Sequence, residues 1–111
     1  WNVCAMPDAL RTRRAVLERH CERIGRDPAT IRQSVQAMLL VTDDEREARP
    51  FVERMAPRAA VAGPVERFAE LAHDWATVGV DEVVVPDLFL GVGQQRRDVM
   101  DAVREAVAAL A

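Results

Sequence analysis

Residues 34–41 of this chain read Ser-Val-Gln-Ala-Met-Leu-Leu-Val, and this stretch decides the fold. It is nearly continuous in apolar character, carries valine near both ends and is too short for a typical helix. Such a run is typical of a strand that is covered on both faces, as in a parallel sheet. We therefore predict a buried strand over Ser34–Val41.

An amphipathic helix is predicted before this strand, over Pro7–Ile24. Proline suits a first helical turn, and Gly25 follows as a C-terminal cap. The residues that recur at helical spacing on the inward face are Leu10, Leu17, Cys21 and Ile24. Cys21 is then expected to be a small core residue.

A second helix is predicted directly after the strand. Thr42-Asp43-Asp44-Glu45 has the pattern of a capping box, in which the Thr42 hydroxyl accepts from the Glu45 backbone N–H. The helix is expected to end near Met55, before Pro57. Its expected inward residues are Ala48, Val52 and Met55.

The second half of the chain repeats the alternation. A helix is expected from near Pro64 to Gly79, with Val65, Phe68, Ala72 and Trp75 inward. A short, fully apolar strand follows at Val83–Val85. A last helix is expected over roughly Gln94–Leu110, with Val99, Val103, Val107 and Leu110 inward. Helices that alternate with apolar strands indicate an α/β fold with parallel strands.

Two predicted strands are too few for a sheet that is buried on both faces, because they leave unpaired edges. Each buried backbone group without a partner costs about 1–3 kcal/mol. The pattern therefore favours part of a larger closed barrel. Residues 1–111 are interpreted as a single fragment of such a barrel domain.

Composition excludes several classes of function. The net charge of −3 gives no reason to expect nucleic acid or an anionic membrane. A helical nucleic-acid binder would rest on seven arginines between Arg11 and Arg32, but Glu18, Glu22 and Asp27 dilute them. No run approaches 18 apolar residues, and the N-terminus lacks the features of a signal peptide. The two cysteines form no metal-ligand pattern, so we expect reduced thiols in a cytoplasmic protein.

Three stretches together resemble the luciferase-like flavin- or deazaflavin-dependent oxidoreductases. The segment from His20 to Pro28, with Ile31 and Ser34, resembles the "HC…GRDP…I…S" pattern of that family. Trp1-Asn2-Val3 looks like the family's "GWN" end of an inner strand, and residues 63–87 are similar to its "GTPE…AGVDEVIVPD" helix–strand unit. The chain departs from the family in lacking a Thr or Ser between Gly63 and Pro64, which removes a helix cap. Cys4 stands where an aromatic residue is common.

The resemblance implies the C-terminal part of a (β/α)8 barrel that binds FMN or coenzyme F420 at the carboxyl ends of its strands. The parent enzyme would be an oxidoreductase or monooxygenase acting on a small molecule. Trp1, Asn2 and Asp87 are the implied cofactor-binding residues, and no catalytic residue or metal ligand is assigned. The segments that hold the cofactor phosphate and handle protons are expected upstream of Trp1. The chain alone is therefore expected to bind no cofactor and to be inactive.

Each of these positions also has a plainer interpretation. Trp1 and Asn2 would be a frayed terminus, and Asp87 a turn residue of the Asx type after Pro86. Thr42 and Asp43 are explained by helix capping. His20 and Cys21 point about 100° apart on a helix and do not share a ligand. The Gly91-Val92-Gly93 turn before a helix is an alternative phosphate-binding element.

A function of another class stays open beside the oxidoreductase. The chain would then be a small α/β interaction module that completes its sheet with a partner chain. Either hypothesis predicts exposed sheet edges and apolar surface that favour self-association.

Overall fold

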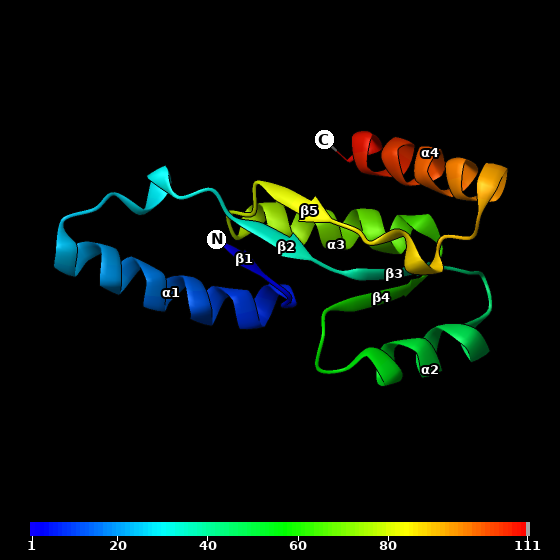
Figure 1. Cartoon of the computed structure of the whole chain (residues 1–111), viewed down its shortest axis with the longest axis horizontal. Helices are drawn as coiled ribbons and strands as arrows, with labels where there is room; N and C mark the ends of the chain where they lie inside the picture. Colours follow the sequence, from blue (N-terminus) through cyan, green and yellow to red (C-terminus); the bar gives the residue numbers. More distant parts are fainter. Residues whose placement is uncertain (111) are drawn as a thin grey trace.

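The stretch that was predicted as one strand forms two short strands in a computed structural model, which describes residues 1–110. These are β2 (Ser34–Gln36) and β3 (Met38–Val41), separated by Ala37 (Figure 1). The Ala37 N–H donates to the Val84 carbonyl and the Met38 N–H to the Ala59 carbonyl, each at 3.0 Å. Because successive backbone groups of an extended chain point to opposite sides, this segment has partners on both flanks.

Helices and strands alternate along the described chain, as predicted. The elements in order are β1 (Asn2–Val3), α1 (Pro7–Ile24), the 3₁₀ turn η1 (Pro28–Thr30), β2, β3, α2 (Glu45–Met55), β4 (Ala60–Gly63), α3 (Val65–Thr77), β5 (Glu82–Val84), the 3₁₀ turn η2 (Asp87–Phe89) and α4 (Gly93–Ala109). The four predicted helices are confirmed, and α1 has the predicted bounds. Gly25 ends α1 in the left-handed conformation, at φ 70°.

The strand β4 was not predicted. Its four residues, Ala-Val-Ala-Gly, are all buried, and β4 pairs with β3 from Met38–Ala60 to Val41–Gly63. Alanine and glycine have little intrinsic preference for strands. Burial between two helices, rather than local propensity, therefore stabilises this strand.

All strand pairs are parallel, and they form two open sheets. One sheet has the order β1–β2–β5 and the other consists of β3 and β4. Figure 1 places β1 and β4 along one side of the β2–β3 segment and β5 along the other. In a closed barrel each strand pairs with the next one, whereas here β5 pairs with β2 and not with β4. The parallel α/β class is thus confirmed, and the strands of residues 1–110 do not close into a barrel.

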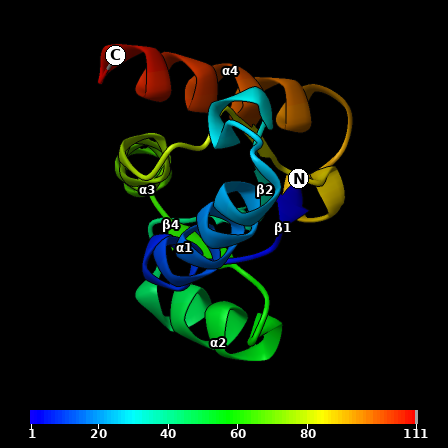
Figure 2. The same ribbon diagram turned by 90° about the vertical axis from the view of Figure 1, so that its left-hand side faces the viewer.

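The two faces of the strands pack against different helices. Odd-numbered strand residues such as Val35, Leu39 and Val61 share one core with α1, α3 and α4. Even-numbered residues of β3 and β4 share a second core with α2; they are Met38, Ala60 and Ala62. Figure 2, which looks along the strands, places α2 on the opposite side of the strands from α4. Three of the four helices therefore cover one face, and α2 alone covers the other.

Helix α3 lies at the centre of the larger core. Trp75 of α3 is completely buried, and its indole Nε1 donates to the carbonyl of Ala5 at 3.0 Å. The buried residues Leu10 of α1 and Val103 of α4 belong to the same core. This arrangement connects the N-terminal segment to the last helix.

Several predicted burial patterns are wrong, each for a local reason. In α2 the buried aromatic residue is Phe51, and Val52 is 39% exposed. Val107 and Leu110 are exposed because the last turns of α4 leave open hollows beside α3. Val84 is 39% exposed, so β5 is not fully buried. It is an edge strand, and no helix covers its even-numbered face.

None of the helices in residues 1–110 combines the length and the apolar composition that a bilayer crossing requires.

We predict that Trp75→Phe lowers the free energy of unfolding by about 2 kcal/mol. The substitution leaves the buried Ala5 carbonyl without its donor and removes part of a large buried ring. Urea denaturation followed by circular dichroism measures the loss. Trp1→Phe is the matched control, since Trp1 is 38% exposed and should change stability by less than about 0.5 kcal/mol. Equal effects of the two substitutions would contradict the central role of Trp75.

Candidate functional site

The carboxyl ends of β3, β4 and β5 form the candidate site. The chain leaves β3 towards α2 on one face, whereas β4 and β5 lead to α3 and α4, which pack on the other face. Where neighbouring parallel strands send their connections to opposite faces, a crevice opens outside their carboxyl ends. Ligands of open α/β sheets bind in such crevices. Three loops lie here: residues 42–44, residues 63–64 and residues 86–89.

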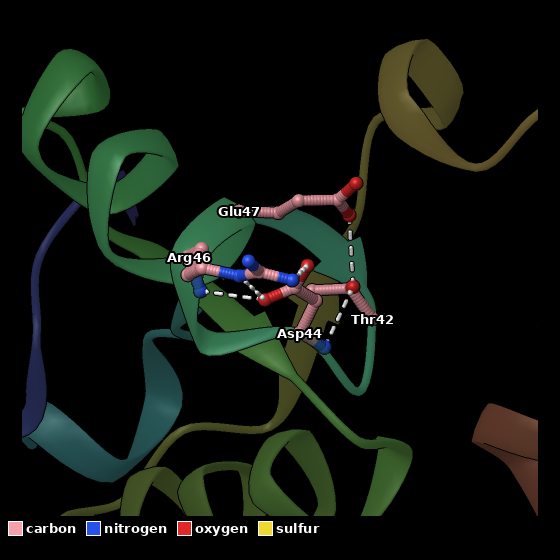
Figure 3. Close-up of polar contacts among 4 residues, drawn as sticks. All are labelled: Thr42, Asp44, Arg46 and Glu47. Carbon is pink, nitrogen blue, oxygen red and sulfur yellow. Dashed lines mark hydrogen bonds and ion pairs between the residues drawn. The ribbon is translucent and has the colours of Figure 1, made fainter.

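The loop after β3 is organised by side-chain caps (Figure 3). The Thr42 hydroxyl accepts from the Asp44 N–H at 3.1 Å and donates to Glu47 Oε2 at 2.9 Å. Asp44 Oδ1 accepts from the Arg46 N–H at 2.9 Å, which makes Asp44 the N-cap of α2. The predicted capping box of Thr42 with Glu45 is therefore wrong. Asp44 directly precedes the first helical residue, so its carboxylate reaches the free N–H groups of that turn.

The ends of β3 and β4 are joined by a backbone hydrogen bond and bridged by an arginine. The Thr42 N–H donates to the Gly63 carbonyl at 2.9 Å. Arg67 of α3 donates through Nη1 to the Ala62 carbonyl and through Nη2 to Glu45 Oε1, both at 2.7 Å. A Cβ on Gly63 would lie 2.6 Å from Arg67 Nη1. Only glycine at this position therefore leaves room for the guanidinium group. Arg67 thus connects the first turns of α2 and α3 across the crevice.

Sequence reasoning did not identify Arg67. Its only signal was the missing cap before Pro64, and α3 does begin without a side-chain hydrogen bond at its N-cap. That the arginine turns back over β4 depends on β4 itself, which was not predicted. A basic residue three positions into a helix carries no such information alone.

Asp87 begins η2, which lies against β3. Its Oδ2 is 2.6 Å from Nη1 of Arg96, and Arg96 Nε donates to the Gly91 carbonyl at 3.0 Å. The bond from the Leu90 N–H goes to the main-chain oxygen of Asp87, at 3.3 Å. Across residues 1–110 the Asp87 carboxylate accepts only from Arg96, so the Asx-type turn is wrong. Arg96, a partner that sequence reasoning missed, fixes the direction of this carboxylate.

Aromatic side chains fill the space between η2 and α2. The rings of Phe51 and Phe89 meet edge to face, with centroids 4.9 Å apart. Phe51 is buried and Phe89 is partly exposed. The contact between η2 and α2 beside Asp87 is therefore apolar.

Trp1 and Asn2 lie at the other end of the strands. Asn2 is level with Ser34, where β2 begins, and its Nδ2 donates to the Ser34 hydroxyl at 2.7 Å. Trp1 lies beside Val16 and Leu17 of α1, on the opposite face of β1. Asp87 follows β5, whose last residue is level with the end of β2. The structure does not bring Asp87 together with Trp1 and Asn2.

Polar side chains gather on the face of the β1–β2–β5 sheet that no helix covers. They come from three adjacent strands and are Asn2, Ser34, Gln36 and Glu82. Arg32 approaches Glu82 to 3.8 Å at the edge of this face. We call these four residues the polar face. The sequence signal was the alternation of Ser34 and Gln36 with Val35 and Ala37, which an apolar reading of the strand overlooked.

The remaining candidates stay apart. No group of three or more metal-binding side chains forms within the described part of the chain. Cys21 is buried in the core as predicted, and His20 is exposed. The Gly91-Val92-Gly93 turn leads into α4 without a side-chain cap, and its role as a phosphate-binding element stays a prediction.

Comparison with known proteins does not assign the chain to a family. A scan against protein-family models gives no match, and a search of curated proteins gives none either. A family assignment therefore depends on the resemblance of the sequence motifs and is a proposal.

We predict that Asp44→Ala lowers the free energy of unfolding by about 1 kcal/mol, because the first N–H groups of α2 lose their cap. Asp43→Ala is the control; it removes the same charge from an exposed neighbour with no such bond. Thermal denaturation of both variants measures the difference. If Thr42→Ala lowers the stability and Asp44→Ala does not, the result would instead support the capping box that the sequence suggested.

Proposed function

We propose that this chain is the C-terminal part of a luciferase-like oxidoreductase or monooxygenase that uses FMN or coenzyme F420. The three resembling stretches occur in the family's order and are spread over residues 1–87. The position of one stretch in the fold suits the assignment, because residues 63–87 run through α3 into β5, as the family's helix–strand unit requires. Trp1-Asn2-Val3 instead lies level with the beginning of β2.

The observation that carries the proposal is the asymmetry of β1 and β2, which stay adjacent in the proposed barrel. Helices α1, α3 and α4 pack against one face, and the polar face is open. In a (β/α)8 barrel the helices surround the strands, and the opposite face of each strand lines the interior. In the proposed barrel the polar side chains of Asn2, Ser34 and Gln36 would therefore face the interior.

The size of the molecule supports an incomplete unit. The radius of gyration is 15.3 Å, whereas a compact domain of this length is expected near 13 Å. In the proposed barrel the unpaired edges receive further strands. Joining them changes two local arrangements: β5 leaves β2 for the edge of β4, and α2 moves to the outer face beside the other helices.

The residues of this chain hold two separate parts of a cofactor site. The amide of Asn2 offers a donor and an acceptor on the polar face, and Asp87 offers a carboxylate that Arg96 keeps oriented. A bound FMN or F420 would supply the redox chemistry, and these side chains would orient it and exclude water. Because the two parts lie at opposite ends of the strands, residues 1–110 do not by themselves enclose a ring.

We therefore predict that the isolated chain shows no saturable binding in a fluorescence titration with FMN or F420. In the longer protein that the proposal requires, Asn2→Ala and Asp87→Ala should each weaken cofactor binding by about tenfold, since each removes a polar contact worth about 1.4 kcal/mol. Arg97→Ala, an exposed change on α4, is the control. Tight binding by the isolated chain would refute the incomplete site, and unchanged binding by both variants would refute the assigned residues.

A second candidate function is an interaction module that completes its sheet with a partner chain. The specific observation in its favour is the apolar surface around the β5 edge. Val84 is partly exposed there, Leu88 is 70% exposed, and Val92 is 75% exposed. Large apolar side chains in such positions mark contact surfaces or aggregation-prone ones.

Analytical ultracentrifugation separates the two candidates. The barrel proposal predicts that the isolated chain forms polydisperse species whose size grows with concentration, because exposed edges have no specific partner. A discrete dimer would favour the interaction module. A compact monomer with a cooperative thermal transition would contradict both.

A further inference from the structure

An apolar groove runs between β5, α3 and α4, with a volume of about 540 Å³. It lies beside the free edge of β5, away from the polar face. The apolar residues that line it include Phe68, Ala72, Val83, Val85, Met100 and Val103. Val107 stands at its rim and is 36% exposed. This groove belongs to neither part of the cofactor site.

The backbone of β5 presents hydrogen-bonding groups beside this groove. The Val84 carbonyl accepts from the Ala37 N–H, so the backbone groups of Val84 face β2. Alternation along an extended chain turns the backbone groups of Val83 and Val85 to the other side. β5 pairs with no second strand in the part of the chain that the structure describes. An edge with free N–H and C=O groups is a template for another strand.

We propose that an extended segment of another polypeptide adds to β5 as a further strand and inserts alternate apolar side chains into the groove. The side chains of Val83 and Val85 line the groove, whereas Val84 points to the uncovered face. An added strand follows the same alternation, so its residues on the Val84 side are polar. Main-chain bonds supply part of the affinity, and the groove selects the side chains.

Charge at the groove defines one end of the incoming segment. Asp81 and Glu82 are exposed and lie where β5 begins. Arg104, the one cation among the lining residues, already pairs with Asp101 at 3.2 Å. Glu82 likewise pairs with Arg32 at 3.8 Å, whereas Asp81 has no cationic partner within residues 1–110. The Asp81 carboxylate therefore favours an arginine or lysine at the matching end of the segment. The partner is thus an extended segment of alternating apolar and polar residues with a basic end.

This inference rests on the second candidate function, the interaction module, in which β5 stays paired with β2. It adds which strand edge is completed and the chemistry of the segment that completes it. The test uses the full chain at a concentration where sedimentation shows monomer. The probe is a synthetic peptide in which valine alternates with threonine, with arginine at one end. Binding should slow amide hydrogen exchange at Val83 and Val85, because their N–H groups gain partners.

Backbone methylation of the peptide tests strand addition directly. N-methyl groups at one alternate set of residues block the N–H groups that face β5 and should abolish binding, while the other set should be tolerated. Equal effects of the two sets would overturn the proposal. So would the absence of exchange protection at Val83 and Val85.

Matched variants test the groove and its charged end. Val107→Glu places a charge at the apolar rim and should weaken peptide binding by at least about tenfold. Ile24→Glu makes the same kind of change at an exposed position on α1, outside the groove, and should leave binding within about twofold. Glu82→Lys should remove the preference for a basic over an acidic peptide end, and Glu105→Lys should not. Binding that ignores Val107→Glu, in variants with unchanged circular dichroism, would overturn the proposal.

A second copy of the chain is the competing occupant. If Val83 and Val85 become protected as concentration rises without peptide, the edge pairs with itself and the proposed partner is wrong. Cofactor titration of the longer protein is independent of these results. If the peptide does not bind at the groove, the oxidoreductase proposal is therefore neither supported nor contradicted, and the cofactor titration still tests it.

Discussion

The backbone of residues 34–41 needs hydrogen-bond partners on two flanks, and the rest of the fold is arranged around that need. Ala37 is the point where the segment bonds to β5 on one side, and Met38 begins its pairing with β4 on the other. A buried N–H or C=O without a partner costs about 1–3 kcal/mol, which is large against the stability of a small domain. The backbone groups of the central segment find hydrogen-bond partners in this way, but those on the outer edges of the neighbouring strands do not. The unpaired outer edges of β1, β4 and β5 follow directly from satisfying the middle.

Helix α3 stabilises this arrangement of strands. The bond from Trp75 to the Ala5 carbonyl connects residues 70 positions apart, and it lies in a core where water does not compete. It places the turn between β1 and α1 against α3, and α3 in turn supports α4. The larger core therefore forms on one face of the strands. Only α2, with Phe51, covers the other face, and it does so over β3 and β4 alone.

Local sequence signals predicted the helices well and the sheet poorly. Pro7 and Gly25 mark the ends of α1, because proline and glycine restrict or permit particular backbone angles by themselves. The strand β4 gave no such signal, since alanine becomes a strand residue here only through burial between α2 and α3. The exposure of Val84 was equally hidden. A valine is apolar in any strand, and whether a neighbour covers it depends on the order of the strands.

The candidate site divides in the same way. Asp87 and Asn2 were identified from the sequence, and their bonds to Arg96 and Ser34 give each a defined orientation. Arg67 escaped notice because its position over Gly63 depends on β4. Sequence reasoning thus proposed Asp87, which follows a strand, and Asn2, which belongs to a motif of the resembling family. It missed groups whose role follows from the packing of one element against another.

Polar and apolar residues alternate within β2, and the mean hydropathy of the whole stretch does not reveal this alternation. Val35 and Ala37 are completely buried. Ser34 and Gln36, which alternate with them, point to the side without helices. A parallel strand that is covered on both faces would carry apolar residues at all four positions. In β3, by contrast, Met38 and Leu39 are both buried, because helices cover both faces of that strand. The alternation in β2 is that of a strand with one face against helices and the other face uncovered, where hydrogen-bonding side chains are not buried without partners.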